Sequence, residues 1–281
     1  MLKQRIITAL ILLVILLPAL FHPSETWLGL LCLLLIMVGA WEWGRLNGLA
    51  FKTSCVLSGA TGSVALWLGE SRFFSEPQTT HFWGVCVLVW LLILSYFLRL
   101  GPGRWQSFPR VFKNVLGIYL LSTSGLALYQ AKILGISFLL SVLCVVWAAD
   151  IAAYFVGRRF GQRKLAPSIS PGKSMEGALG GVVAVWVLAG GWLLASPFWP
   201  VLDDSIFHRL SIHGTLTLVL CLLCVTLTSV AGDLFESLMK RSAGVKDSSA
   251  LLPGHGGVLD RLDALLPVLP LSIWLTRVIS S

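Results

Sequence analysis

Charged residues are scarce in this sequence. Of its 281 residues only 12% are Asp, Glu, Lys or Arg, well below the ~25% of a typical soluble domain. With 56% hydrophobic residues and a mean hydropathy of +0.85, too little polar surface remains to cover a water-soluble core of this size. Most soluble folds are therefore excluded, and the composition indicates a protein that crosses a lipid bilayer several times.

Two common functional motifs are also missing. The six cysteines lie in apolar runs, and Cys221 and Cys224 lack the second pair or the histidines that a zinc site needs. We interpret all six as small hydrophobic residues. The Gly172-Lys173-Ser174 triplet is not a Walker A loop, because Pro167 stands where the first glycine of that loop is required. A P-loop nucleotide hydrolase is therefore excluded.

Long apolar stretches run through the whole chain. A helix needs roughly 20 residues to cross the bilayer, and the alternating pattern of a membrane β-barrel is not seen. The sequence therefore predicts an all-α, polytopic integral membrane helical bundle with about nine transmembrane helices. The predicted spans are 6–21, 27–41, 54–68, 82–98, 115–129, 133–156, 175–195, 214–234 and 262–279.

Lysine and arginine are distributed unevenly between the predicted loops. If the N-terminus is inside, 17 of them lie on its side of the membrane, and only Arg72, Lys132, Arg209 and Arg277 lie on the other. Cationic loops concentrate on the cytoplasmic side, so we expect a cytoplasmic N-terminus. The net charge of +8 then reflects topology and anionic substrates rather than nucleic-acid binding. No small-residue cleavage site follows the first apolar run, so we expect that helix to be retained.

Dense polar chemistry is confined to two segments, 150–177 and 233–263, both on the predicted cytoplasmic side. We expect residues 1–130 to form N-terminal transmembrane helices and residues 131–281 to form a catalytic transmembrane region with its active site at the cytoplasmic face. Within the second region, the spacing Gly177-x-x-x-Gly181 is typical of close helix packing.

Four aspartates stand out in these segments. Asp150 lies inside a predicted span, where a carboxylate costs roughly 2.5–3.5 kcal/mol, so it should face the bundle interior. Asp233 ends another span, and Asp260 and Asp263 begin the last one. Each has a structural alternative: ion pairing for Asp150, a solvated helix end for Asp233, and helix capping for Asp260 or Asp263. Their accumulation at one membrane face favours a shared chemical role.

Cations accompany these acids. Lys173 and Ser174 precede a predicted helix, where backbone N–H groups suit a phosphate. Lys240, Lys246 and Arg261 lie in the second polar segment. Hard carboxylate oxygens hold Mg²⁺, while substrate phosphates complete its coordination. The residues therefore point to magnesium-assisted phosphoryl or nucleotidyl transfer at the membrane surface.

A longer motif makes this more specific. The pattern runs Ser237-Leu-Met-Lys240-Arg241, four residues, then Lys246-Asp247-x-Ser249-x-x-Leu252-Pro253-x-His255-Gly256-Gly257-Val258-x-Asp260-Arg261-Leu262-Asp263. It resembles the signature of the phosphatidate cytidylyltransferase (CDP-diacylglycerol synthase) family. The blocks Ser170-Pro171-x-Lys173-Ser174-x-Glu176-Gly177 and Asp150-x-x-Ala153-Tyr154 are also similar to that family. The resemblance covers residues 147–263, while the first five spans match in hydropathy only.

The resemblance implies an integral membrane enzyme that converts CTP and phosphatidate into CDP-diacylglycerol and pyrophosphate in phospholipid synthesis. It further implies Mg²⁺ or a pair of cations, a homodimer, and a multi-pass location in a bacterial inner (plasma) membrane. By this similarity Asp233 and Asp260 hold the metal, with Asp263 in support. We expect catalytic roles for Asp233, Asp260, Lys173, Lys246 and His255. We expect substrate binding by Ser170, Ser174, Glu176, Lys240, Arg241, Asp247, Gly256, Gly257 and Arg261.

The nucleophile in that reaction is a phosphate oxygen that is already ionised near neutral pH. A general base is not required, so we interpret His255 as a positioning or donor residue. The nearest alternative is a CTP-dependent lipid kinase, which transfers the γ-phosphoryl group to an alcohol and needs a base. A transporter or channel is a second alternative, but it predicts polar residues spread through the spans rather than gathered at one face.

Overall fold

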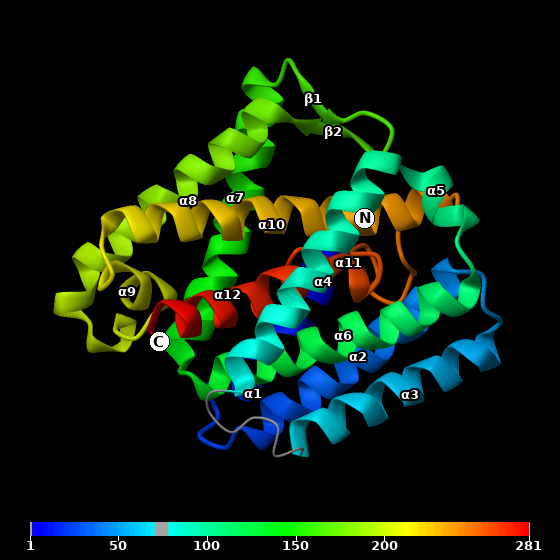
Figure 1. The fold of residues 1–281 in the computed structure, drawn as a ribbon, viewed down its shortest axis with the longest axis horizontal. Helices are drawn as coiled ribbons and strands as arrows, with labels where there is room; N and C mark the ends of the chain where they lie inside the picture. Colours follow the sequence, from blue (N-terminus) through cyan, green and yellow to red (C-terminus); the bar gives the residue numbers. More distant parts are fainter. Residues whose placement is uncertain (1, 71–77, 281) are drawn as a thin grey trace.

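The computed structural model describes residues 2–70 and 78–280, which form an almost wholly helical molecule (Figure 1). Arg72, which was counted to the outer side, lies outside the described residues. The long helices are α1 (Leu2–Phe21), α2 (Thr26–Leu46), α3 (Phe51–Glu70), α4 (Gln78–Leu100), α6 (Arg110–Ile133), α7 (Ile136–Phe160), α8 (Met175–Ala195), α10 (Thr215–Ser242) and α12 (Leu265–Ser280). The short elements are α5 (Pro102–Ser107), β1 (Lys164–Ala166), β2 (Ser170–Ser174), η2 (Ser196–Phe198), η3 (Pro200–Leu202), α9 (Ile206–Ser211) and α11 (Leu259–Leu262).

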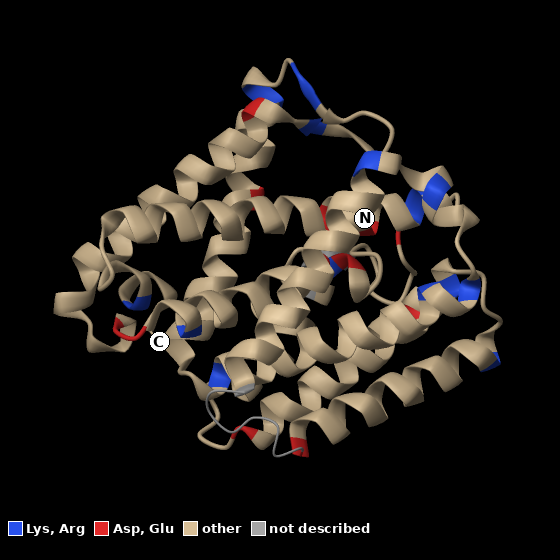
Figure 2. Ribbon diagram, viewed as in Figure 1, with Lys and Arg blue, Asp and Glu red and all other residues tan. Residues whose placement is uncertain are grey.

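The structure supports a polytopic membrane protein. Each of the nine predicted spans coincides with a long helix. Within residues 2–70 and 78–280, seven helices are long and apolar enough to cross a membrane, and α1 and α3 are not among them, so the count of nine is not confirmed. Apolar side chains such as Leu194, 77% exposed, point away from the protein, as contact with lipid allows. Figure 2 shows most charged residues at helix ends and in connecting segments.

One short hairpin departs from the all-α prediction. Strands β1 and β2 pair antiparallel, with Lys164 opposite Ser174, and project beyond the ends of α7 and α8 (Figure 1). The Glu176 carboxylate accepts hydrogen bonds from the backbone N–H groups of Gln162 and Arg163, at 3.0 and 3.2 Å. The first turn of α8 thereby fixes the chain that leaves α7, and Lys173 is held at a defined place beside the helices.

Close packing of α7 on α8 confirms the interpretation of the small-residue spacing. A Cβ atom on Gly177 would lie 2.7 Å from the carbonyl oxygen of Ala153, and one on Gly181 would lie 2.9 Å from that of Ala149. Both distances are shorter than side chains tolerate, so only glycine permits this approach. The contact brings the turn of α7 that carries Asp150 close to α8.

Aromatic packing fixes the end of α10 where the acidic residues lie. Phe235 is buried, and its ring contacts those of Trp43 from α2 and Trp105 from α5 at centroid distances of 6.2 and 5.3 Å. It also contacts the rings of Trp90 and Phe97 from α4. The pairs with Trp90 and Trp105 are edge-to-face, and such aromatic pairs each contribute about 0.5–1.5 kcal/mol beyond burial. Three N-terminal elements therefore hold α10 in place directly beside Asp233 and Glu236.

Candidate functional site

An ion pair joins the two polar segments. Lys173 Nζ of β2 lies 2.5 Å from Asp233 Oδ2 of α10, and each side chain is about a quarter exposed. The Ser237 hydroxyl donates to the other oxygen, Oδ1, of Asp233 at 3.3 Å. Asp150 of α7 lies close enough to interact electrostatically with both Asp233 and Lys173. The structure thus gathers residues of α7, β2 and α10 at one place, as the sequence predicted.

A second, more buried ion-pair group lies one turn further along α10. Lys240 Nζ lies 2.6 Å from Asp260 Oδ1 and also contacts the carboxylate of Glu236. The three side chains are only 11%, 6% and 2% exposed, in the order Lys240, Asp260 and Glu236. Because a buried charge is costly without a partner, each of these groups depends on the others.

The second oxygen of Asp260 is held by the loop that precedes α11. Asp260 Oδ2 accepts from Ser248 N at 2.8 Å, from Ser248 Oγ at 2.8 Å and from Gly257 N at 2.7 Å. Gly256 has a φ of +82°, and a Cβ atom there would lie 2.7 Å from the same oxygen. Gly256 and Gly257, which were predicted to bind substrate, therefore bring the backbone close to Asp260 in this structure.

Asp263 completes the group of acids. Its Oδ1 accepts from Ala264 N at 2.7 Å, and its carboxylate interacts electrostatically with Asp233, Lys240 and Lys173. A Cβ atom on Gly232 would lie 2.8 Å from the carbonyl oxygen of Asp263, so a glycine on α10 lets the start of the last span approach closely. Asp233 and Asp263 are thus brought together across two helices.

Several residues predicted to bind substrate make contacts within the protein. Ser174 is the N-cap of α8, and its hydroxyl oxygen accepts from Gly177 N at 3.1 Å. Arg241 donates to the carbonyl oxygens of Ile169 and Val245. The structure therefore gives these residues and Glu176 supporting contacts to the backbone, and their binding role stays a prediction.

The remaining predicted residues lie at the surface of this region. Lys246 and Asp247 are exposed on the loop after α10, and Ser170, at the start of β2, is half-buried. Arg261 donates to the carbonyl oxygen of His255 at 2.5 Å. His255 Nδ1 is buried and has no hydrogen-bond partner among residues 2–70 and 78–280. Over the same residues, no ion pair includes Lys246 or Arg261.

Sequence reasoning missed Glu42 of α2. This carboxylate is fully buried, with 0% exposure, and its partners are Ser248, Ser249, Val258 and Leu259. A signal was present, because Glu42 is a lone acid within an apolar run and such a residue is a candidate for function. Ser248, which donates to Asp260, was also missed.

The donors suit a hard divalent cation, although they do not form a complete cage. In the described part of the chain, no group of three His, Cys, Asp or Glu side chains is arranged to hold a metal ion. Mg²⁺ is commonly held by one or two carboxylates, with substrate phosphates and water supplying the rest. Asp233 and Asp263 fit that requirement, because they are two carboxylates that interact electrostatically and the backbone of Asp263 packs on Gly232, next to Asp233. Asp260 already accepts from Lys240 and from three loop donors.

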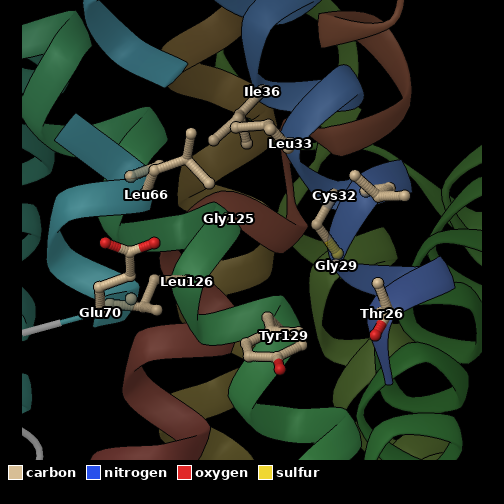
Figure 3. A pocket seen from close by; sticks show the side chains of 13 residues that line it. Thr26, Gly29, Cys32, Leu33, Ile36, Leu66, Glu70, Gly125, Leu126 and Tyr129 are labelled. Carbon is tan, nitrogen blue, oxygen red and sulfur yellow. The ribbon is translucent and has the colours of Figure 1, made fainter. Parts of the chain in front are cut away.

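A separate pocket lies between α2, α3 and α6 (Figure 3), with a volume of about 310 Å³. Its walls are mostly apolar, with Glu70 and Tyr129 among the few polar side chains. None of the predicted site residues lines it. The pocket is therefore separate from the acids and cations of the two polar segments.

Comparison with known proteins covers almost the whole chain. The sequence profile of the Cytidylyltransferase family matches residues 3–279. The phosphatidate cytidylyltransferase of Pseudomonas aeruginosa is 38% identical over 277 residues, spanning 96% of this chain and 95% of that protein. Those of Haemophilus influenzae and Bacillus subtilis are 35% and 31% identical, and the matches cover 96% and 80% of this chain and the same shares of those proteins. The similarity thus includes the N-terminal helices, which the sequence had matched by hydropathy only.

Proposed function

This chain belongs to the Cytidylyltransferase family, and from that premise we infer that it is an integral membrane enzyme that converts CTP and phosphatidate into CDP-diacylglycerol and pyrophosphate. The observation that carries this conclusion is the 38% identity to a phosphatidate cytidylyltransferase over 96% of the chain. The reaction is a nucleotidyl transfer in phospholipid synthesis. It is also the activity that the acids and cations of the two polar segments suggest by their chemistry.

The reaction joins two polyanions. A phosphatidate oxygen forms a bond to the α-phosphorus of CTP, and the bond from that phosphorus to the bridging oxygen breaks, so the electron pair leaves with pyrophosphate. Positive charge must screen the approach and stabilise the leaving group. Lys173 and Lys240 lie among the acids, and Lys246 and Arg261 lie at the surface beside them. We assign these four cations to the phosphates of the substrates.

For the metal, we propose that Asp233 and Asp260 hold Mg²⁺, or a pair of cations, with Asp263 as a supporting ligand. The proposal is supported by the oxygen chemistry of the donors and by the electrostatic proximity of Asp263 to Asp233. When bound, Mg²⁺ would neutralise the nucleotide phosphates. Asp260 is the most constrained of the three, because four donor groups already contact its two oxygens, whereas two contact those of Asp233. Its ligation therefore requires Lys240 to exchange partners.

The other predicted residues supply binding and orientation. Ser170, Ser174 and Glu176 belong to the hairpin and the first turn of α8, beside Lys173. Arg241, Asp247, Gly256 and Gly257 belong to α10 and the loop after it. His255 carries a buried ring nitrogen that finds no partner within the described residues. This fits a residue that donates to a substrate oxygen, since the ionised phosphate nucleophile needs no base.

We further propose that the enzyme is a homodimer in a bacterial inner membrane, with its N-terminus and its active site in the cytoplasm. The bacterial relatives support the bacterial membrane, and the 17-to-4 distribution of Lys and Arg supports the orientation. The homodimer rests on the resemblance to the CDP-diacylglycerol synthase family. Light scattering of the detergent-solubilised chain, whose mass is 30.6 kDa, separates a dimer from a monomer. The orientation of the site is reported by a cysteine introduced at Asp247 in a chain whose six native cysteines are replaced. It is labelled from either side of sealed vesicles.

The activity itself is tested with labelled nucleotide. Purified protein is incubated with phosphatidate and CTP that carries label in either the α- or the γ-phosphate. Cytidylyl transfer places the α-label in lipid and the γ-label in pyrophosphate. A lipid kinase would place only the γ-label in lipid, and that result would overturn the proposed function.

A further inference from the structure

Glu42 lies in α2, far from the catalytic motif in sequence. Within residues 2–70 and 78–280, every hydrogen-bond donor to its carboxylate belongs to residues 248–259, here called the 248–259 loop. The carboxylate is fully buried, and the ion pairs of residues 2–70 and 78–280 do not include it. Burial of a charge is costly, so these neutral donors alone offset that cost. The donors are Ser249 Oγ at 2.5 Å and Val258 N at 3.0 Å to Oε1, and Leu259 N at 2.6 Å and Ser248 Oγ at 3.2 Å to Oε2.

Ser248 connects Glu42 to Asp260. Its hydroxyl oxygen lies 2.8 Å from Asp260 Oδ2 and 3.2 Å from Glu42 Oε2. A hydroxyl has one proton, so it donates to one of these carboxylates at a time. The backbone N–H of Ser248 donates to Asp260 in either case, at 2.8 Å. The loop therefore lies between the two carboxylates and contacts both.

Gly257 shows how little space separates the two acids. Its N–H donates to Asp260 Oδ2 at 2.7 Å. A Cβ atom on this residue would lie 2.3 Å from Glu42 Oε1 and 2.1 Å from Ser248 Oγ. Only glycine lets the backbone pass between Glu42 and Asp260, so a shift of either carboxylate displaces the donors of the other.

We propose that Glu42 is a positioning residue for the reaction: it fixes the 248–259 loop so that Ser248 and Gly257 hold one oxygen of Asp260, and the other oxygen faces Lys240. The role rests on the proposed function, in which Asp260 acts on the substrates. It makes α2, in the N-terminal half of the chain, part of the active-site structure.

The Glu42→Gln variant tests this role without a change of size. Its amide nitrogen donates rather than accepts, so it would face one of the backbone N–H groups of Val258 and Leu259. The loop must then shift, and a displacement of about 1 Å at a catalytic group costs about 10²-fold in rate. We expect kcat/KM to fall about 10- to 100-fold. Ser249→Ala, which removes one donor and keeps the carboxylate, should give a smaller loss in the same direction.

Asn47→Ala, at the C-cap of the same helix, provides the matched control. Asn47 is buried, donates to the carbonyl oxygen of Trp43 at 2.9 Å and accepts from Trp105 Nε1 at 3.1 Å. Its loss removes buried polar contacts of α2 that do not involve the 248–259 loop. We expect a lower Tm with kcat/KM within threefold of the wild type.

The experiment measures Tm and kcat/KM for CTP on the full chain in detergent. The variants are the three named above, Ser248→Ala, and the double variant Glu42→Gln/Ser248→Ala. If Glu42 acts through the loop, the double variant should lose less kcat/KM than the product of the fold-losses of Glu42→Gln and Ser248→Ala. The proposal is overturned if kcat/KM of Glu42→Gln stays within threefold of the wild type, or if the fold-losses of the two single variants multiply in the double variant. It is also overturned if Asn47→Ala, with the same Tm as Glu42→Gln, loses as much kcat/KM.

A second readout separates this proposal from the activity. Hydrogen exchange at the Val258 and Leu259 amides should accelerate in Glu42→Gln and stay unchanged in Asn47→Ala. Unchanged exchange in Glu42→Gln overturns the role of Glu42, whatever the activity. If the wild type fails to transfer the cytidylyl group, the proposed function is wrong, while faster exchange still supports Glu42 as the residue that fixes the loop.

Discussion

Lys173 and Asp233 form an ion pair between β2 and α10, with 2.5 Å between Nζ and Oδ2. Both side chains are about a quarter exposed, whereas Lys240 and Asp260 of the neighbouring pair are 11% and 6% exposed. Exposed pairs are weak, and buried pairs are hard to separate. A phosphate therefore reaches Lys173 more easily than Lys240, and we place the first contact with the nucleotide at Lys173.

Replacement of Lys173 tests this assignment. Lys173→Met removes the charge and should lower kcat/KM for CTP about 10²-fold, as expected for the loss of one group that stabilises transition-state charge. Lys173→Arg keeps the charge and should retain part of the activity. Steady-state kinetics at varied CTP measures both, and equal activity of Lys173→Met and the wild type would remove Lys173 from the site.

Asp260→Asn should lower both turnover and Tm, unlike a substitution at the protein surface. It should abolish turnover, because Asp260 is a proposed ligand. It should also lower Tm, because Lys240 loses one of its two acids and the loop donors meet a weaker acceptor. Loss of one partner of a buried pair typically costs about 3–5 kcal/mol. We expect the variant to remain inserted in the membrane; a fully active variant would contradict the assignment.

Removal of divalent cations should stop the reaction. If Asp233 and Asp260 hold Mg²⁺, a chelator should reduce label transfer from CTP to background, and added Mg²⁺ should restore it. The assay uses the wild-type chain with phosphatidate vesicles, with the chelator in excess over residual metal. Full activity in chelator would show that the cationic side chains suffice without a metal.

The packing of α7 on α8 gives a prediction about stability. Alanine is more favourable than glycine in a helix by about 0.8–1.0 kcal/mol. Gly190→Ala should therefore leave Tm equal or higher, because a Cβ atom there meets nothing within 4 Å. Gly181→Ala should lower Tm, because its Cβ atom would lie 2.9 Å from the carbonyl oxygen of Ala149. Thermal unfolding in detergent compares the two, and an equal effect would contradict the close contact.

The positions of the long helices follow from the apolar runs, since bilayer thickness sets a length that sequence alone can show. The sequence also predicts five of the charged residues that the structure brings together, which are Asp233, Asp260, Asp263, Lys173 and Lys240. They lie within short segments whose spacing places acids and cations together.

Contacts between distant parts of the chain were not predictable in this way. Glu42 and Ser248 are 206 positions apart, and no periodic pattern links α2 to the loop before α11. The hairpin was missed because strands of three and five residues are too short to show alternation. The backbone contacts of Glu176 were missed because an acid in the first turn of a helix already suits the helix dipole.

Transfer of α-labelled cytidylyl groups to phosphatidate by the wild type, Asp233→Asn and Asp204→Asn tests the central claim most directly. Asp204 pairs with Arg209 at 3.0 Å in the segment before α9 and has a φ of 65°, which asparagine tolerates. It is therefore a matched control away from the site. We predict lipid labelling by the wild type and by Asp204→Asn within twofold of each other, and a loss of about 10²-fold or more for Asp233→Asn. Labelling by Asp233→Asn at the wild-type rate would contradict the account.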